Sequence, residues 1–273
     1  MTGEIERIVV ALDATSENRT AIDTAARLAA RWKAHLHGVF VEDDDLIRLA
    51  NLPFARVVTL GFGVEAIDLQ QARRQMRAFA ERARHELAAA ARRYQVEWSF
   101  EIEHDPAAGR IGAAEITDFL VCGTTSRPIG GHFRVECRWW SVVEPGSSPL
   151  LLAHSDWRDG AVAVLLQDRE PLSERLVAVA AQLAEAHGGR LAVICPPELA
   201  NSPDFKTWLD GCLTGLAVTV ELDLSPMQPA ALFRRIRELD CRLIAVAAGT
   251  PQAQAERLRD IVAKVACNVL VVR

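Results

Sequence analysis

The amino-acid sequence predicts an α/β protein made of two tandem doubly wound domains, each with a five-stranded parallel sheet flanked by helices. Three observations predict this fold class. Short apolar runs alternate with amphipathic helical stretches along the chain, which indicates βαβ units. The same order of elements, β-α-β-α-β-α-β-α-β, occurs twice at a spacing of about 140 residues. The 273 residues are also enough for two domains of ordinary size.

The composition agrees with helices packed on parallel sheets. Hydrophobic residues make up 50% of the chain, charged residues 25% and aromatic residues only 6%, which suits an α/β protein better than an all-β sandwich. The formal net charge of −5 gives no electrostatic reason to expect nucleic acid as a partner.

The first half of the chain contains five apolar runs and two clear helical patterns. The runs predict strands at 8–12, 35–41, 96–103, 119–123 and 149–153. A helix capped near Asn18 extends to about Trp32, and a long helix over 65–94 has apolar residues at steps of three and four. We expect an irregular loop over 46–64, where Gly61 and Gly63 break regular structure, and shorter helices over 110–117 and 134–143.

The second half repeats this order after a polar stretch at residues 154–160. We interpret that stretch as the domain boundary, which gives domains at 1–155 and 156–273, the second of them shorter. The predicted strands lie at 161–166, 190–195, 218–223, 242–247 and 268–272. The predicted helices lie at 173–187, 203–214, 229–239 and 252–264.

Cysteine spacing and hydropathy favour a cytoplasmic protein. None of the six cysteines forms a Cys-x-x-Cys motif, so we interpret them as structural thiols in a reducing compartment, with a redox-sensing thiol as the alternative. The chain opens with polar residues that do not resemble a signal peptide. No apolar stretch approaches the roughly 20 residues that a membrane span needs, so we expect no membrane partner.

Four short segments carry a resemblance to a known family. Ile8–Asp13, followed by Ala-Thr-Ser, resembles the opening strand and Asp-Gly-Ser turn of the universal stress proteins, and Lys33–Val41 resembles their second strand. Asp168 followed by Ser173–Arg175 is similar to the same opening in a second copy. Ala266–Arg273 resembles the closing strand, which usually reads Pro-Cys-Pro-Val-Leu-Val-Val. The resemblance covers nearly the whole chain and implies strand order 3-2-1-4-5 in each domain.

The resemblance also implies a place for a nucleotide. ATP-binding members place an Asp near the nucleoside, the end of the second strand beside the base, and a loop Gly-x2-Gly-x9-Gly-Ser/Thr around the phosphates. Glycines and a helix N-terminus let backbone N–H groups close on phosphate. The positions of this chain that correspond to such a site in domain 1 are Asp13, Ala14, Val41, Gly123, Ser126 and Cys137.

The loop departs from the family pattern in both halves. In domain 1, Ser126 replaces the second glycine and Glu136–Cys137 replaces the Gly-Ser pair. The Glu136 carboxylate would repel phosphate. In domain 2, the connection after Ala247 is shorter and keeps no glycine pair. We therefore expect no cofactor and weak or absent nucleotide binding, with ATP or another small molecule in domain 1 as the alternative.

These observations leave three functional hypotheses. The first is a non-catalytic stress-response or regulatory protein that acts through ligand or partner binding. The second is a small-molecule binder, with the ligand between Asp13, Val41 and the turn 123–126. The third, an enzyme with weak ATPase or nucleotidyl-transfer activity, has least support because the chain has no Walker loop, no Gly-x-Ser-x-Gly elbow and no His-Glu-x-x-His motif.

We expect no metal site. His35 and His37 share one face of a strand and precede the acidic residues 42–45. They lie at the strand's start, however, and the carboxylates follow its far end, about 15–20 Å away.

Asp13 and Asp168 each follow the first strand of a half, at the edge where α/β folds bind ligands. For both residues the alternative to ligand binding is a capping or turn role.

Several features indicate contacts between domains or with partners. The family resemblance suggests that the closing strands, Leu150–Ala153 and Val269–Val272, pair about a pseudo-twofold axis, either within one chain or in a homodimer. Trp139 and Trp140, next to Arg138, cannot share one helix face, so one could pack inside while the other covers a pocket or an unknown protein partner. The arginine-rich face of helix 65–94 is interpreted as solvated, with an anionic partner as the alternative.

Overall fold

The protein is described by a computed structural model. The residues that the structure describes are 5–13, 18–41, 56–58, 64–66, 69–103, 118–123, 128–129, 133–134, 148–156, 158–223, 229–247 and 267–272.

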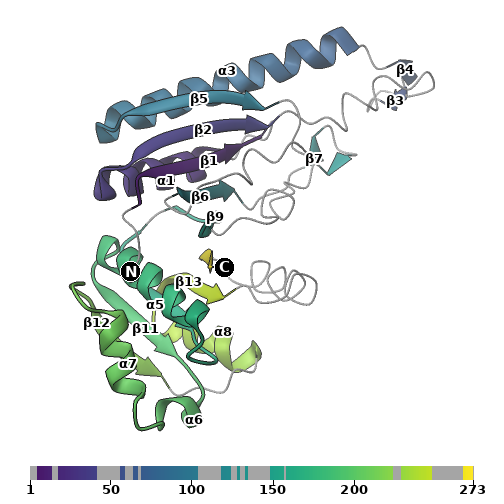
Figure 1. Ribbon diagram of the computed structural model, residues 1–273. Helices are drawn as coiled ribbons and strands as arrows, with labels where there is room; N and C mark the ends of the chain where they lie inside the picture. The colour runs from purple at the N-terminus through teal and green to yellow at the C-terminus, as the bar shows by residue number, and fades with distance from the viewer. Residues whose placement is uncertain are drawn as a thin grey trace.

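One ten-stranded sheet forms the centre of the molecule (Figure 1). Its first half consists of β1 (Arg7–Leu12), β2 (His35–Val41), β5 (Trp98–Glu103), β6 (Asp118–Gly123) and β9 (Leu150–Ala153). Its second half consists of β10 (Ala161–Leu165), β11 (Arg190–Ile194), β12 (Thr219–Asp223), β13 (Cys241–Ala247) and β14 (Asn268–Val272). The strands lie in the order β12-β11-β10-β13-β14-β9-β6-β1-β2-β5. Each half therefore has order 3-2-1-4-5, which confirms the predicted fold class.

The two halves of the sheet meet through their closing strands. β14 and β9 pair antiparallel, with Leu270 opposite Leu151, whereas every other neighbouring pair in this sheet is parallel. The buried Asn268 side chain stabilises this junction, because its Oδ1 accepts hydrogen bonds from the backbone N–H groups of His154 at 2.9 Å and Ser155 at 3.0 Å. The expected pairing of the closing strands is thus present within a single chain.

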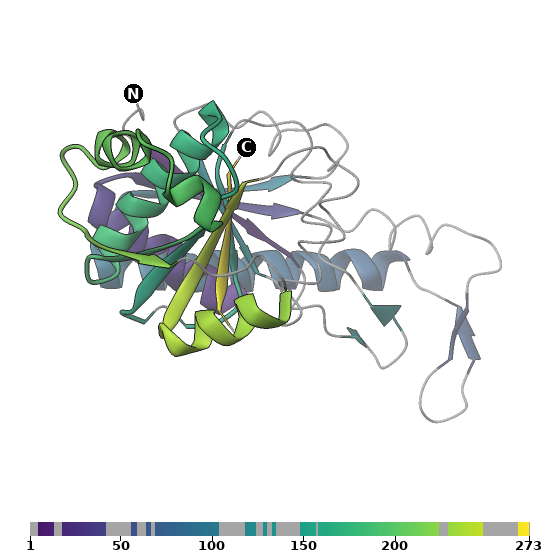
Figure 2. The same cartoon turned by 90° about the horizontal axis from the view of Figure 1, so that it is seen from below.

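Helices cover both faces of the sheet, and each face has its own apolar core (Figures 1 and 2). One core includes residues of four helices, α1 (Asn18–Trp32), α3 (Leu69–Tyr94), α5 (Pro171–Ala186) and α7 (Phe205–Cys212). A short helix, α6 (Pro197–Ala200), precedes α7. The opposite core includes residues of α8 (Pro229–Glu238). Successive strand residues point to opposite faces, which is why nearly every residue of β1, β6, β10 and β14 is buried.

The long helix α3 packs closely on the sheet at Gly38. A Cβ atom at this glycine of β2 would lie 2.5 Å from Cδ2 of Leu87 in α3. Leu87 is fully buried and belongs to the same core as Leu12 and Leu36. The missing side chain at Gly38 therefore allows α3 to approach β2.

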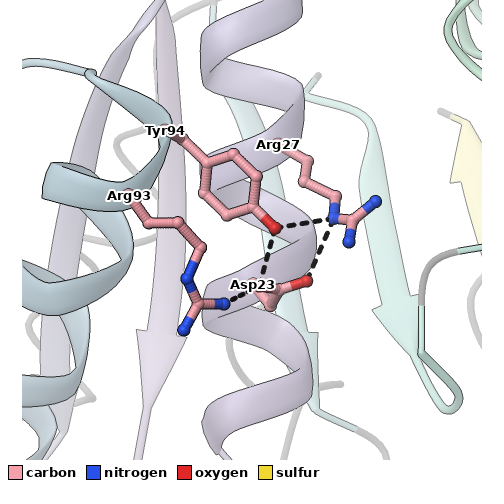
Figure 3. Close-up of polar contacts among 4 residues, drawn as sticks. All are labelled: Asp23, Arg27, Arg93 and Tyr94. Carbon is pink, nitrogen blue, oxygen red and sulfur yellow. Dashed lines mark hydrogen bonds and ion pairs between the residues drawn. The ribbon is translucent and has the colours of Figure 1, made fainter.

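A polar cluster joins α3 to α1 at the surface (Figure 3). Asp23 of α1 accepts hydrogen bonds from Tyr94 Oη at 2.9 Å, from Arg93 at 3.1 Å and from Arg27 at 3.1 Å. Arg27 Nε also donates to Tyr94 Oη at 2.8 Å. Because the arginines are well exposed, we expect each pair to add little stability alone.

Two short hairpins differ from the sequence-based expectation. β3 (Arg56–Val58) and β4 (Val64–Ala66) pair antiparallel, so the predicted irregular loop over 46–64 and the predicted helix start at residue 65 were wrong there. β-Branched residues on both sides of a segment with two glycines favour paired strands over a helix. β7 (Pro128–Ile129) and β8 (Phe133–Arg134) form the second hairpin, which places Arg134 in a strand instead of a helix.

The other predicted elements agree with the structure to within about two residues. α6 was not predicted; it begins at Pro197, in the first turn, where proline is well tolerated. The predicted helices over 110–117 and 252–264, and residues 135–143 of a third, lie outside the described residues. Among the helices that the structure describes, none combines the length and the apolar character that a membrane span requires.

Candidate functional site

The structure brings three of the predicted site residues to the carboxyl edge of the sheet. Leu12 ends β1 opposite Phe40 of β2, so Asp13 follows beside Val41, the last residue of β2. On the other side of β1, Ala11 lies opposite Cys122, and Gly123 comes next at the end of β6. In open α/β sheets, ligands bind outside the carboxyl ends of the strands, where the strand order reverses. Asp13, Val41 and Gly123 occupy this place in the first half.

The other three predicted site residues are not described. Ala14, Ser126 and Cys137 lie outside the described residues, and so does Glu136. The altered phosphate loop therefore stays a prediction from the sequence. Trp139 and Trp140 lie outside the described residues as well.

The Asn18 side chain joins the start of α1 to Asp13, which follows β1. Its side-chain Nδ2 donates to the carbonyl oxygen of Asp13 at 2.8 Å, and its Oδ1 accepts from the Asp13 N–H at 3.3 Å. Asn18 is the first residue of α1 and is 9% exposed, so both bonds form in a region of restricted solvent access. The position of Asp13 is therefore fixed by a side chain five residues later.

The equivalent turn in the second half is built differently. Asp168 Oδ1 accepts hydrogen bonds from Ser173 Oγ at 2.5 Å and from the Glu170 N–H at 3.1 Å. Ser173 belongs to the first turn of α5 and is buried. The Asp168 carboxylate thus acts as a turn residue, which was the alternative to its ligand-binding role.

Glu103 is a residue of this edge that the sequence analysis missed. It ends β5 opposite Val41, and only 6% of its surface is exposed. A buried carboxyl group one strand away from Val41 would disfavour a phosphate ligand at this edge if it is ionised. Its position could have been found from the sequence, because it ends a predicted strand of the same parallel sheet.

The two histidines of β2 contact the neighbouring strand β5. His35 Nε2 lies 2.7 Å and His37 Nδ1 lies 2.8 Å from Ser99 Oγ. His37 Nε2 lies 3.5 Å from Glu101 Oε1. Burial lowers the pKa of His35, and the neighbouring His37 lowers it further. Within the described residues, no three His, Cys, Asp or Glu side chains are arranged to hold a metal ion, and residues 42–45 lie outside them.

The five described cysteines are free thiols, and those with a resolved shift have a raised pKa. Burial raises the pKa of Cys241 and of Cys267 to about 12, and it also raises the pKa of Cys212. Such thiols carry little thiolate near neutral pH. These values favour the structural interpretation of the cysteines over a redox role.

The arginine-rich face of α3 is exposed and partly neutralised along its own length. Arg82 lies 3.1 Å from Glu86, and Arg84 lies 3.7 Å from Glu81. Neighbouring charges of this kind on a helix are typical of a solvated surface.

Comparison with solved structures shows that this fold occurs elsewhere over nearly the whole chain. A universal stress protein from Archaeoglobus fulgidus is similar with a TM-score of 0.64 and 15% identity, covering 99% of this chain and 97% of that one. A proposed universal stress protein from Pseudomonas aeruginosa UCBPP-PA14 has a TM-score of 0.60 and 13% identity, covering 98% and 93%. A protein of unknown function from P. aeruginosa PAO1 has the same TM-score and identity, covering 98% and 92%.

No protein-family model matches the sequence, and no curated protein sequence is significantly similar to it. At 13–15% identity, the likeness to the solved structures establishes the fold. The chain therefore has the α/β fold of the universal stress proteins, with their mostly parallel sheet in ten strands. Function has to be argued from the site.

Proposed function

We propose that this chain is a non-catalytic regulatory protein of the stress-response type, which acts by binding a ligand or a protein partner. The observation that carries the proposal is the convergence of Asp13, Val41 and Gly123 at the carboxyl edge of the first half of the sheet. This place combines a carboxylate, an apolar side chain and a glycine where α/β folds bind small molecules. The fold shared with universal stress proteins supports the class of function by analogy.

In this proposal the chain divides into two domains, residues 1–155 and 156–273, and the first domain is the ligand-binding one. The corresponding carboxylate of the second domain, Asp168, is already used to hold the turn before α5. A ligand that needed Asp168 would have to displace the hydroxyl of Ser173 and the N–H of Glu170. The first domain also keeps the longer loop after its fourth strand, which makes it the better candidate.

We propose further that a nucleoside triphosphate binds weakly or not at all. The sequence replaces the second glycine of the phosphate loop by Ser126 and introduces Glu136 where phosphates would lie. The buried Glu103 adds a carboxyl group at the same edge. The alternative function, ATP binding in domain 1, is favoured by Asp13 and Gly123, which correspond to the nucleotide-site positions that the sequence resemblance implies.

Isothermal titration calorimetry with ATP, ADP and adenosine decides between these two functions. We expect no heat of binding at micromolar concentrations of either phosphorylated ligand. Micromolar affinity for ATP that is lost in Asp13→Ala and kept in Asp168→Ala would establish the alternative. The two substitutions form a matched pair, because each removes one carboxylate from the equivalent turn.

A thermal-shift screen of small metabolites without phosphate groups tests for a different ligand. A compound that raises the melting temperature of the wild type, but not that of Asp13→Ala, would support the proposed site. If no compound stabilises the protein, binding at this edge is wrong and partner binding remains. Light scattering of the purified chain separates a monomer from the possible homodimer.

The proposal places the protein in the cytoplasm. The five described cysteines are free, as expected in a reducing compartment. Fractionation of cells that express the tagged chain would test this location.

A further inference from the structure

A polar cluster lies on the edge strand of the sheet, apart from the carboxyl edge described above. β5 ends the sheet order, and β2 is its neighbour. His37 lies directly opposite Ser99 in the pairing of these strands. Since side chains alternate along a strand, His35, His37, Ser99 and Glu101 share one face. Register therefore explains why two imidazoles meet one hydroxyl group and why a carboxylate lies beside one of these imidazoles.

The hydrogen bonds of this cluster fit one arrangement of protons. When His37 carries its proton on Nε2, that N–H faces Glu101 Oε1 at 3.5 Å. His37 Nδ1 is then an acceptor for the Ser99 hydroxyl, 2.8 Å away. The remaining lone pair of Ser99 Oγ accepts from His35 Nε2–H at 2.7 Å. A serine has one proton to donate, and this assignment uses it once in the two hydrogen bonds of Ser99 and leaves the Nε2–H of His37 facing a carboxylate.

We propose that Ser99 is a covalent acylation site that reacts with activated esters of small carboxylic acids, with His37 as its general base. Ser99, His37 and Glu101 follow the order nucleophile, base and orienting carboxylate that activates serine on unrelated folds. Glu101 acts as a positioning residue that holds the tautomer of His37. His35 supplies an N–H donor next to Oγ, where negative charge develops on the attacked carbonyl oxygen.

The reaction transfers one acyl group and needs no further reagent. A lone pair of Ser99 Oγ forms a bond to the carbonyl carbon of the ester, while the hydroxyl proton moves to His37 Nδ1. The bond between the carbonyl carbon and the leaving oxygen then breaks, and its electron pair stays on that oxygen. The leaving group takes the proton from His37 or departs as an anion, and Ser99 remains as an ester.

The cluster is accessible to a small reagent. The side chain of Glu101 is 44% exposed and that of His37 is 16% exposed, and Ser99 is neither fully buried nor fully exposed. Acylation here would change the charge distribution and hydrogen bonding of β5 without involving Asp13. The inference therefore goes beyond the proposed function, and the two can fail independently.

Mass spectrometry of the full chain treated with p-nitrophenyl acetate tests the proposal. We expect rapid addition of one acetyl group, located on Ser99 by peptide mapping, and loss of this addition in Ser99→Ala. Ser202→Ala is the matched control, because the Ser202 hydroxyl donates only to the Leu199 carbonyl at 2.9 Å and has no imidazole partner. Acetylation of wild-type Ser99 no faster than of Ser202, or confined to other side chains, would overturn the proposal.

Substitutions of the base and the carboxylate separate chemistry from structure. We expect His37→Ala to slow acetylation of Ser99 by about 100-fold and free imidazole to restore part of the rate. Glu101→Gln should slow it without changing the melting temperature, and Glu101→Asp should recover part of the loss. An unchanged rate in His37→Ala would show that His37 is not the base.

Discussion

In each half, the side chain five residues after an aspartate joins the end of the first strand to the next helix, but it contacts a different part of that aspartate. In the first half, the Asn18 side chain binds the backbone of Asp13. In the second half, the Asp168 side chain accepts from the hydroxyl of Ser173, also five residues later. The comparison teaches that a strand can be joined to the helix that follows it either through the backbone of an aspartate or through its carboxylate.

The largest expected difference in stability between the two halves appears on acidification and arises from His187, the residue after α5. Its Nδ1–H donates to the Arg158 carbonyl at 2.9 Å, and burial lowers its pKa from 6.5 to about 4. Between these values the unfolded chain binds a proton that the native chain does not. The stabilisation is therefore fully present above pH 6.5 and is lost as the pH falls toward about 4, by about 3 kcal/mol.

Urea unfolding of the wild type and of His187→Gln across this pH range measures the effect. The stability of the wild type should fall relative to that of the variant as the pH decreases. Hydrogen exchange should show the loss first in α5 and only later in α1, the corresponding helix of the first half. Parallel pH profiles for the two proteins would contradict the assigned role of His187.

The second-largest effect should come from Asn18→Ala. The substitution removes two hydrogen bonds and leaves the N–H and carbonyl groups of Asp13 without these partners, at an expected cost of about 2 kcal/mol. Chemical denaturation gives this value directly. Asn201→Ala, at an exposed asparagine after α6, is the control and should cost less than about 0.5 kcal/mol.

Ser173→Ala should have a smaller effect in the second half, about 1 kcal/mol, because one hydrogen bond to an exposed carboxylate is lost. The same denaturation assay compares it with Asn18→Ala. If Ser173→Ala costs more, the second turn is the more tightly held one, and the order argued above is reversed. Asp168→Asn, which keeps an oxygen acceptor, should cost less than Asp168→Ala.

The smallest changes in the free energy of unfolding should arise at surface hydrogen bonds between neighbouring helices. Tyr94→Phe removes the hydroxyl that links Asp23 to Arg27 and should cost less than about 1 kcal/mol. In the second half, Glu174→Gln weakens a single bond from Trp208 Nε1 at 3.2 Å and should cost still less. A double-mutant cycle of Tyr94→Phe with Asp23→Asn measures the coupling within the first cluster. A coupling near zero would mean that the contacts of Figure 3 are not energetically linked.

Much of the fold could be predicted because strands of a parallel sheet are marked by continuous apolar runs. Ile8–Leu12 and Leu150–Ala153 are such runs, and both are strands in the structure. The strand order came from the family resemblance, and no local pattern contains it. The hairpin of β3 and β4 was missed because three-residue strands next to glycines give almost no periodic signal.

The candidate site could be predicted only in part. Asp13, Val41 and Gly123 were found because each follows or ends an apolar run. Asn18 and Ser173 are both residues that favour helix N-termini. The sequence therefore cannot tell that Asn18 binds the backbone of the preceding aspartate whereas Ser173 binds its carboxylate. Glu103 was missed because the alternation of Ser99, Glu101 and Glu103 is typical of an exposed edge, whereas burial depends on tertiary packing.

The antiparallel pairing of β9 with β14 has a consequence for synthesis of the chain. β14 is the last strand along the sequence, yet it lies in the middle of the sheet. Between the synthesis of β9 and that of β14, the fully apolar strand β9 has an unpaired side in a first half that is otherwise able to collapse. During this interval the nascent chain exposes an aggregation-prone strand edge, which the pairing with β14 then covers.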